Sequence, residues 1–396
     1  MAFFDENTLF ILDSYGLIYR EYFAFINRPL TNAAGENISA VFGFFRNLSS
    51  IIKAHRPRFL VAAMDSKTPT FRHELYPEYK ATREKTPEDL HAQIPWIEEA
   101  LAALGVPVLQ QDGVEADDII ATVAAQCKAT GITCRILSGD KDLMQLVDNT
   151  TQVLKPDKAS GGWTECGTAE VTAEWGVPPE QLLDLLSLTG DTADNVPGVA
   201  GVGEKTALKL LTQYGSLDGI YAAAAEIKGA MGNKIRAGKE SAYFSRQLIT
   251  LKYDVDIPLD FESFSTAQLN YKKAAAVLKK YGAAVPAKAF AELALAAGSG
   301  ETAQNMQETL DADNIPVRQN VGSYKAVLDI AELHNYIEEI RNLPDKTFAF
   351  DTETDSLNSL SCTLVGFSLS HTAGSGIYVP VTAGEDLFAQ GIDKNA

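Results

Sequence analysis

The chain has 396 residues, of which 46% are hydrophobic, and this length is enough for two or three globular domains. Its 34 basic and 52 acidic residues give a net charge of −18, which excludes a protein that binds a polyanion over its whole surface, so any nucleic-acid contact is expected to be local. The four cysteines form no CxxC pair, the first residues lack a basic signal region, and no apolar run reaches transmembrane length, so we expect a reduced, cytoplasmic protein with no zinc site, no export signal and no membrane partner.

Short apolar runs alternate with amphipathic helical patterns from Thr8 to about Leu154. Three runs are apolar and end at a polar break, as strands do: Thr8–Leu12, Phe59–Met64 and Cys134–Leu137. Helices are predicted over Ser39–His55, around Ile94–Leu104, and from Asp117 through Cys127. This alternation predicts a parallel α/β sheet flanked by helices.

Acidic residues follow these strands or open a helix, and nine of them form the set Asp13, Asp65, Glu115, Asp117, Asp118, Asp140, Asp142, Asp191 and Asp194. Because the carboxyl ends of parallel strands meet at one edge of a sheet, we expect these acids to converge. Crowded carboxylates repel one another unless cations lie among them, and without His or Cys ligands the expected ions are Mg²⁺ or Mn²⁺. Such a site suits phosphodiester hydrolysis. Each acid alone has a simpler explanation, since Asp117 and Asp118 also suit the dipole of a helix start, so the metal site is inferred from the set.

The segment from Met64 to Lys85 is a local exception to the acidic charge, because it interleaves cations with aromatic residues. Cations can hold phosphates while rings stack on unpaired bases. A solvated helix face with a few packed tyrosines explains the same composition. The position of the segment directly after Asp65 favours a substrate contact.

The pattern becomes helical from Pro178 to about Tyr281, with glycine-rich breaks expected at 198–203, 215 and 229–232. Residues Asp191 to Ala207 place Gly198, Gly201 and Gly203 in a tight hairpin before a helix. Glycines let backbone N–H groups approach a duplex phosphate, and Lys205 adds positive charge. An ordinary glycine-rich helix connector is the alternative.

The remaining residues predict a linker and a second unit. The stretch from about Ala294 to Asn320 has no period and many small and acidic residues, which is typical of a linker. A strand pair is expected at Thr347–Phe350 and Leu364–Leu369. Asp351 and Glu353 lie two residues apart, which puts them on one face of a strand and lets them share a metal. Because the chain supplies no later aspartates for such a site, an exposed acidic strand end describes the activity of this stretch better.

These motifs closely resemble a known family, the amino-terminal 5′-nuclease domains of bacterial DNA polymerase I, which are relatives of flap endonucleases. The resemblance covers about residues 1–290 and rests on five blocks: Leu12–Asp13, Asp65–Arg83, Gly113–Asp118, Gly139–Leu143 and Asp191–Ala207. One departure is Asp13-Ser14-Tyr15-Gly16, where the family commonly has Gly directly after the Asp. The tail around Asp351 and Glu353 is similar to the first motif of the family's 3′ to 5′ proofreading domain, whose later aspartates do not follow here.

The resemblance implies a PIN-like α/β domain at 1–175, a helical DNA-binding extension with a helix-hairpin-helix at 176–290, a linker at 291–321, and an incomplete RNase H-like 3′ to 5′ exonuclease domain at 322–396. It implies metal-site roles for all nine acids. Lys80, Arg83 and Arg72 would act at the scissile phosphate. The DNA contacts would be Arg20, Tyr22, Tyr79, Gly198, Gly201, Gly203, Lys205 and Thr206, with a K⁺ ion at the hairpin as in family members.

The expected partners are therefore DNA with 5′ flaps, nicked or gapped duplex, and RNA primers on DNA, bound by a monomer. The chain would be the front part of a longer polymerase or a truncated gene product. Two alternatives stay open. One is a PIN-type ribonuclease, which needs no duplex grip. The other is a DNA-binding platform whose carboxylates only stabilise the fold.

Overall fold

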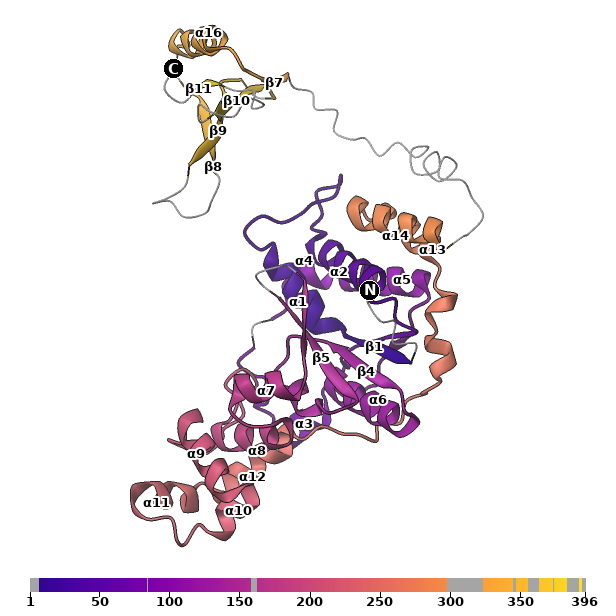
Figure 1. The fold of residues 1–396 in the computed structure, drawn as a ribbon, viewed down its shortest axis with the longest axis vertical. Coiled ribbons are helices and arrows are strands. Elements are labelled where there is room, and N and C mark those ends of the chain that lie inside the picture. The colour runs from indigo at the N-terminus through magenta and orange to yellow at the C-terminus, as the bar shows by residue number, and fades with distance from the viewer. Residues whose placement is uncertain are drawn as a thin grey trace. The chain divides into compact units, whose positions relative to one another are not determined.

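The structure is a computed structural model that describes residues 7–83, 85–157, 162–297, 323–344, 347–354, 363–372, 374–382 and 392–393 (Figure 1). The chain divides into two compact units, one up to Glu308 and one after it. Most of the linker expected between Ala294 and Asn320 lies outside the described residues. Each unit is described by itself below.

The centre of the first unit is a six-stranded sheet in the order β3-β2-β1-β4-β5-β6. Strands β1 to β5 are parallel to their neighbours, and β6 runs antiparallel to β5. The run from Leu9 to Leu12 is buried, as expected for a parallel strand covered on both faces. The three predicted strands are confirmed within a residue at their ends, and the full set is β1 (Thr8–Asp13), β2 (Phe59–Ala63), β3 (Val108–Leu109), β4 (Thr133–Leu137), β5 (Thr151–Pro156) and β6 (Trp163–Cys166).

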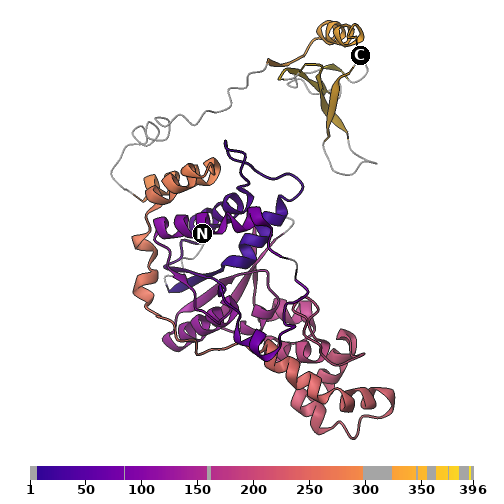
Figure 2. The same cartoon turned by 180° about the vertical axis from the view of Figure 1, so that it is seen from behind.

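Helices cover both faces of this sheet (Figures 1 and 2). On one face α6 packs against β1, where Ile119 and Val123 join the same core cluster as Leu9 and Ile11. On the other face α1 packs on α2, α2 on α14, and α5 on α13. The helices predicted over Ser39–His55 and Ile94–Leu104 have those bounds. The helices of this layer structure are α1 (Ser14–Ala24), α2 (Ser39–His55), α3 (Phe71–Leu75), α4 (Glu88–His91), α5 (Ile94–Leu104), α6 (Ala116–Thr130), α13 (Tyr271–Lys280) and α14 (Ala284–Ala296).

A helical extension follows the sheet. Its helices gather at the end of the unit opposite α13 and α14 in both views (Figures 1 and 2). Helix α8 starts with Pro179, whose missing N–H costs nothing in the first turn, and packs against α9, α12 and the 3-10 helix η1. The elements are η1 (Asp142–Leu146), α7 (Thr168–Trp175), α8 (Pro179–Thr189), α9 (Glu204–Tyr214), α10 (Leu217–Ala222), α11 (Gly229–Ala237) and α12 (Lys239–Ile249). The 3-10 helices η2 (Phe261–Phe264) and η3 (Thr266–Gln268) follow the extension, and η2 contacts β2 of the sheet.

The break predicted at 229–232 was wrong, because these residues form the first turn of α11. Gly232 is buried there, and a Cβ atom would lie 1.7 Å from the carbonyl oxygen of Ile227. The glycine therefore permits a close helix–loop contact and does not end the helix. Among the described residues, no helix is both long enough and apolar enough to cross a membrane.

The second unit is a sheet in the order β11-β10-β9-β8, with β7 paired to β10. The predicted strand pair is confirmed, since β8 and β9 are antiparallel and Asp351 lies opposite Ser368. Helix α16 packs on the sheet through a small core that contains Leu333, Leu369 and Val379. The elements are β7 (Tyr324–Ala326), α16 (Ile330–Arg341), β8 (Ala349–Thr354), β9 (Leu364–Ser370), β10 (Gly376–Thr382) and β11 (Ile392–Asp393).

Strand β8 forms an edge of this sheet, and all six of its residues are exposed. Phe350 keeps 58% of its surface in contact with solvent, and Asp351 and Glu353 are exposed beside it. A long exposed edge strand with apolar residues is a pairing and aggregation hazard. From the small core and the exposed edge we predict that this unit is only weakly stable.

Candidate active site

Three neighbouring strands bring the predicted acids to one edge of the sheet. Asp13 is the last residue of β1 and caps α1 by accepting a hydrogen bond from the Gly16 backbone N–H. Asp65 follows β2, and its Oδ1 accepts a 2.8 Å bond from the N–H of Ala116 at the start of α6. Asp140 follows β4, and it accepts a bond from the Asp142 N–H. Because β2, β1 and β4 are adjacent and parallel, their ends meet.

The first group of carboxylates is Asp13, Asp65, Asp117 and Asp140. Burial and the negative charges of Asp140 and Asp65 together raise the pKa of Asp13 to about 6, against the hydrogen bonds from Ser138 and Gly16, which lower it. Burial and the charges of Asp140 and Asp13 raise the pKa of Asp117 well above its usual range. These four acids therefore share one electrostatic environment that favours protons or cations.

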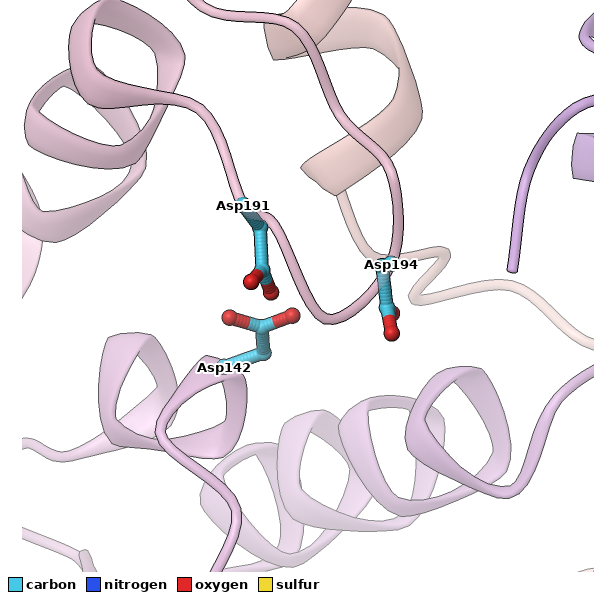
Figure 3. A group of neighbouring side chains, drawn as sticks. All are labelled: Asp142, Asp191 and Asp194. Carbon is cyan, nitrogen blue, oxygen red and sulfur yellow. The ribbon is translucent and has the colours of Figure 1, made fainter. Parts of the chain in front are cut away.

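The second group is Asp142, Asp191 and Asp194, whose side chains offer oxygens that all lie within 4.8 Å of one another. Figure 3 shows the carboxylates of Asp142 and Asp191 facing each other. Burial and the charges of Asp140, Asp191 and Asp194 raise the pKa of Asp142 to about 7. Its buried Oδ1 has no hydrogen-bond partner in the described part of the chain. A buried, unpartnered carboxylate oxygen beside two further carboxylates fits a divalent cation.

Asp118 and Arg72 lie apart from both groups, and the predictions for them need correction. Arg72 is 1% exposed, and its Nη1 and Nη2 atoms lie 2.7 and 2.9 Å from the two carboxylate oxygens of Asp118. Nη1 also lies 2.8 Å from Oε2 of Glu115. Nε and Nη2 donate to the carbonyls of Leu248 and Thr250 at the end of α12. Arg72 therefore has no N–H group left for a substrate phosphate, and both carboxylate oxygens of its buried partner Asp118 already accept hydrogen bonds, which does not suit a metal ligand.

Glu115 connects this buried ion-pair cluster to the substrate segment. The Lys80 ammonium lies 2.6 Å from Oε1 of Glu115 and 3.8 Å from Oδ2 of Asp194. Burial lowers the pKa of Lys80, but the charges of Glu115 and Asp194 raise it more, so the side chain stays protonated. Lys80 has a φ of 57°, a backbone conformation that residues other than glycine rarely adopt. Its backbone N–H donates a hydrogen bond to the Asp194 carbonyl. Strain of this kind is typical of functional positions.

Two further residues of the segment differ in accessibility. The Arg83 guanidinium is 52% exposed and donates from Nε to Oδ1 of Asp194 at 3.1 Å. Tyr79 is 5% exposed, and its hydroxyl lies 3.2 Å from Glu115 and 3.1 Å from Asp194. Arg83 is therefore open to a phosphate. The expectation that Tyr79 contacts DNA is not met by this arrangement, because its ring is buried.

The two residues predicted on α1 also differ. Arg20 is partly exposed, pairs with Glu21 at 3.0 Å and lies 5.7 Å from the centre of the Trp163 ring. Tyr22 is 4% exposed and donates a 2.7 Å hydrogen bond to Asp89. Burial and that hydrogen bond raise the pKa of Tyr22 to about 12. The prediction of a substrate contact for Tyr22 is therefore corrected, since the hydroxyl already serves a packed contact.

The three hairpin glycines have three different surroundings. Gly198 has a φ of 62°, and a Cβ there would lie 2.3 Å from the backbone nitrogen of Gly190. Gly201 has a φ of 74°, and its Cβ would lie 2.6 Å from Nζ of Lys234. Gly203 faces open space. The backbone N–H groups of Ala200, Gly201 and Gly203 have no acceptor among the residues that the structure describes. Gly198 is thus a packing requirement, whereas the Gly201–Gly203 turn presents N–H groups to solvent.

Sequence reasoning gave no role to two residues that organise the acids. The Ser138 hydroxyl donates to Oδ2 of Asp13 at 2.6 Å and accepts the Asp140 N–H, so it holds two acids of the first group in place. The Lys141 ammonium lies 2.7 Å from Oδ1 of Asp191. Their position inside the Ser138–Asp142 turn was the available signal, since polar residues between two site acids commonly orient them.

The pKa values predict how metal ions and pH act on stability. Asp13 at about 6 and Asp142 at about 7 bind protons more tightly when folded than the usual value of 3.8 allows, so their contribution to metal-free stability falls as pH rises from about 4 to 7. Divalent ions compete with those protons. At one fixed Mg²⁺ concentration, about 100 times the Kd at pH near 8, we expect the ion to add about 2.7 kcal/mol at that pH and clearly less at pH near 5.5, where protons weaken Mg²⁺ binding. Thermal unfolding with and without Mg²⁺ at both pH values measures this. Equal stabilisation at both would contradict it.

Comparison with known proteins identifies the domains of this chain. Residues 8–176 match the 5′–3′ exonuclease N-terminal resolvase-like domain, and residues 177–272 match the 5′–3′ exonuclease C-terminal SAM fold. Residues 324–387 match a 3′–5′ exonuclease domain. DNA polymerase I of Treponema pallidum is 40% identical over 427 residues, covering 95% of this chain and 42% of that protein. DNA polymerase I of Borreliella burgdorferi is 34% identical over 394 residues, covering 98% of this chain and 42% of that protein.

Solved structures share the fold of the first unit. A bacteriophage T5 5′-exonuclease with bound zinc ions has a TM-score of 0.51 and 20% identity, covering 72% of this chain and 99% of that one. A T5 flap endonuclease complex with DNA and metal ions has a TM-score of 0.51 and 19% identity, with coverage of 72% and 99%. The chain spans less than half the length of the curated polymerases that it matches. The chain therefore belongs to the 5′–3′ exonuclease family, in the form that bacterial DNA polymerase I contains.

Proposed function

We propose that the first unit is a divalent-metal-dependent nuclease that cuts DNA at 5′ ends and flaps. The observation that carries this proposal is the convergence of seven carboxylates in two adjacent groups at one sheet edge, with Lys80 and Arg83 beside them: Asp13, Asp65, Asp117 and Asp140 in one group, and Asp142, Asp191 and Asp194 in the other. The solved T5 relatives are described as a 5′-exonuclease with divalent ions and as a flap endonuclease with DNA and metal ions.

Magnesium or manganese ions are the expected occupants of both carboxylate groups, and they would supply the Lewis-acid chemistry of phosphodiester hydrolysis. Lys80 would hold the scissile phosphate, because its ammonium stays charged next to the acids and is oriented by its contact to Glu115. Arg83 is half exposed on the same side and suits a bidentate phosphate contact. Arg20 would contact the substrate from α1.

The hairpin is proposed to hold the duplex. Its open N–H groups at Ala200, Gly201 and Gly203 precede the first turn of α9, where Lys205 and Thr206 lie. Backbone donors and a helix start favour a phosphate of any sequence. We also propose that a K⁺ ion binds at this hairpin. The carbonyls of Gly198 and Gly201 already accept hydrogen bonds from Ser241 and Lys234, so a bound K⁺ would need other carbonyls of the turn.

We propose that the limit near residue 175 between the PIN-like part and the helix-hairpin-helix extension holds. The sequence analysis carried the extension to 290, but α13 and α14 pack on α5 and α2, so we propose that these two helices belong with the sheet layers. The family ranges 8–176 and 177–272 support this division. Asp351 and Glu353 would be the first metal-site acids of a 3′ to 5′ exonuclease whose matched range is 324–387. We propose polymerase activity, and primer removal in replication and repair, only for a longer protein with the length of the matched polymerases.

A comparison of substrates tests the proposal against the ribonuclease alternative. The chain, supplied with Mg²⁺, is expected to cut flap-bearing DNA duplex at least tenfold faster than single-stranded RNA of the same length, because the hairpin grip is engaged only by a duplex. Initial rates on the two labelled substrates measure this ratio. A preference for the RNA would overturn the proposal and favour a PIN-type ribonuclease.

A further inference from the structure

The glycine-rich hairpin is held by two serines of α12 and by Gly238, the residue that joins α11 to α12. The Ser241 hydroxyl donates to the Gly198 carbonyl, and the Ser245 hydroxyl accepts a 2.9 Å bond from the Gly198 N–H. A Cβ on Gly238 would lie 2.5 Å from Cγ1 of Val199, so this residue packs directly on the hairpin. The position of α11 relative to the hairpin is therefore fixed by the fold.

Lys234 of α11 reaches the open turn of this hairpin. Its ammonium donates to the Gly201 carbonyl at 3.1 Å, and the side chain is exposed. Any side chain at position 201 would collide with it, since a Cβ there would lie 2.6 Å from Nζ. An ammonium carries three N–H donors, and the Gly201 carbonyl is the one acceptor found for them among the described residues. Two donors therefore stay open to solvent beside the unpaired N–H groups of the turn.

The sequence between Glu226 and Glu240 is a second local exception to the acidic charge of this chain. Residues 227–239 contain Lys228, Lys234, Arg236 and Lys239 and no acid, in a protein whose net charge is −18. Arg236 donates to the carbonyls of Ala224 and Ile227, and the Lys239 ammonium lies 6.0 Å from the ring centre of Tyr221. Lys234 is the cation of this stretch that contacts the hairpin.

We propose that Lys234 is a second phosphate ligand of the duplex grip, in addition to Lys205. The Gly201 carbonyl holds the ammonium in place, so a duplex phosphate meets a pre-positioned cation and the backbone donors of Ala200, Gly201 and Gly203 together. Fixing the lysine before binding lowers the entropy that the contact costs. This inference rests on the proposed function, because it assumes that the hairpin binds duplex DNA.

The test is DNA binding by Lys234→Met as a function of salt, measured in EDTA so that the DNA is not cut. The slope of log K against log salt is expected to fall in magnitude by about 0.9, the value of one phosphate contact, and binding near 0.1 M salt is expected to weaken about three- to tenfold. Lys234→Arg should keep the wild-type slope, because it keeps the charge. Lys273→Met, which removes an exposed lysine on α13, is the matched control and should change neither quantity.

A purely structural role for Lys234 gives a different result. If the lysine only fastens the hairpin, Lys234→Met would weaken binding with an unchanged slope and a lower melting temperature, and that outcome would overturn the inference. Lys205→Met separates the two proposals. If Lys205→Met lowers the slope of log K against log salt and Lys234→Met does not, the result contradicts only the role of Lys234. A wild-type chain that binds no duplex, or a slope that neither variant changes, sinks the proposed grip as well.

Discussion

Arg72→Ala is expected to destabilise the first unit by about 3–5 kcal/mol, the usual cost of removing one partner from a buried ion pair. In the variant the carboxylate of Asp118 stays fully buried but loses its cationic partner, and Glu115 loses one of its two cationic partners. It also leaves the carbonyls of Leu248 and Thr250 without their donor. Because these carbonyls end α12, the loss would loosen the joint between the sheet and the helical extension.

Urea unfolding followed by circular dichroism measures this change. Arg83→Ala is the matched control, because it removes the same group from a site that is half exposed, and it should cost less than about 1 kcal/mol. Adding Asp118→Ala to Arg72→Ala should recover part of the loss, since no unpaired buried charge remains. A stable Arg72→Ala variant with lowered cleavage would restore the original prediction that Arg72 acts on the substrate.

Lys80→Met is expected to lower kcat about 100- to 1000-fold with a much smaller change in KM, as removal of one well-placed cation does at a transition state. Methionine keeps the length of the apolar stem and meets the same backbone strain at a φ of 57°, so the variant removes the charge alone. Glu115 keeps Arg72 as a partner, which limits the effect on stability.

Single-turnover cleavage separates this effect from DNA binding. Lys85→Met removes an exposed lysine five residues along the same segment and is expected to keep the wild-type rate. Full turnover by Lys80→Met would mean that the metal ions and Arg83 hold the phosphate without it.

The positions of the acids were predictable because they depend on local pattern. Strand runs that end at Asp13, Asp65 and Asp140 determine both the sheet and its ligand-binding edge. The role of Arg72 was not predictable in this way. Its partners Leu248 and Thr250 lie more than 170 residues away along the chain, and nothing in the local sequence shows that they are close.

Burial separates residues that look alike in the sequence. Tyr79 and Arg83 belong to one cationic and aromatic segment, yet one ring is buried and one guanidinium is half exposed. Gly198 and Gly203 belong to one hairpin, yet one meets backbone atoms and the other open space. Residue type and spacing predicted the location of the site, whereas the contacts of each side chain depend on how distant elements pack.

The measurement that tests the central claim most directly is cleavage of a 5′-labelled flap duplex with Mg²⁺, comparing the wild-type chain with an Asp140→Ala, Asp142→Ala double variant. The two substitutions remove one acid from each carboxylate group. We expect the wild type to cut near the flap junction in a metal-dependent way, and we expect the cleavage rate of the variant to be lower by at least about 1000-fold. An Asp112→Ala variant, which removes an exposed acid outside both groups, should cut normally. A folded, DNA-binding wild type that cuts nothing, or a double variant that cuts normally, would contradict the account.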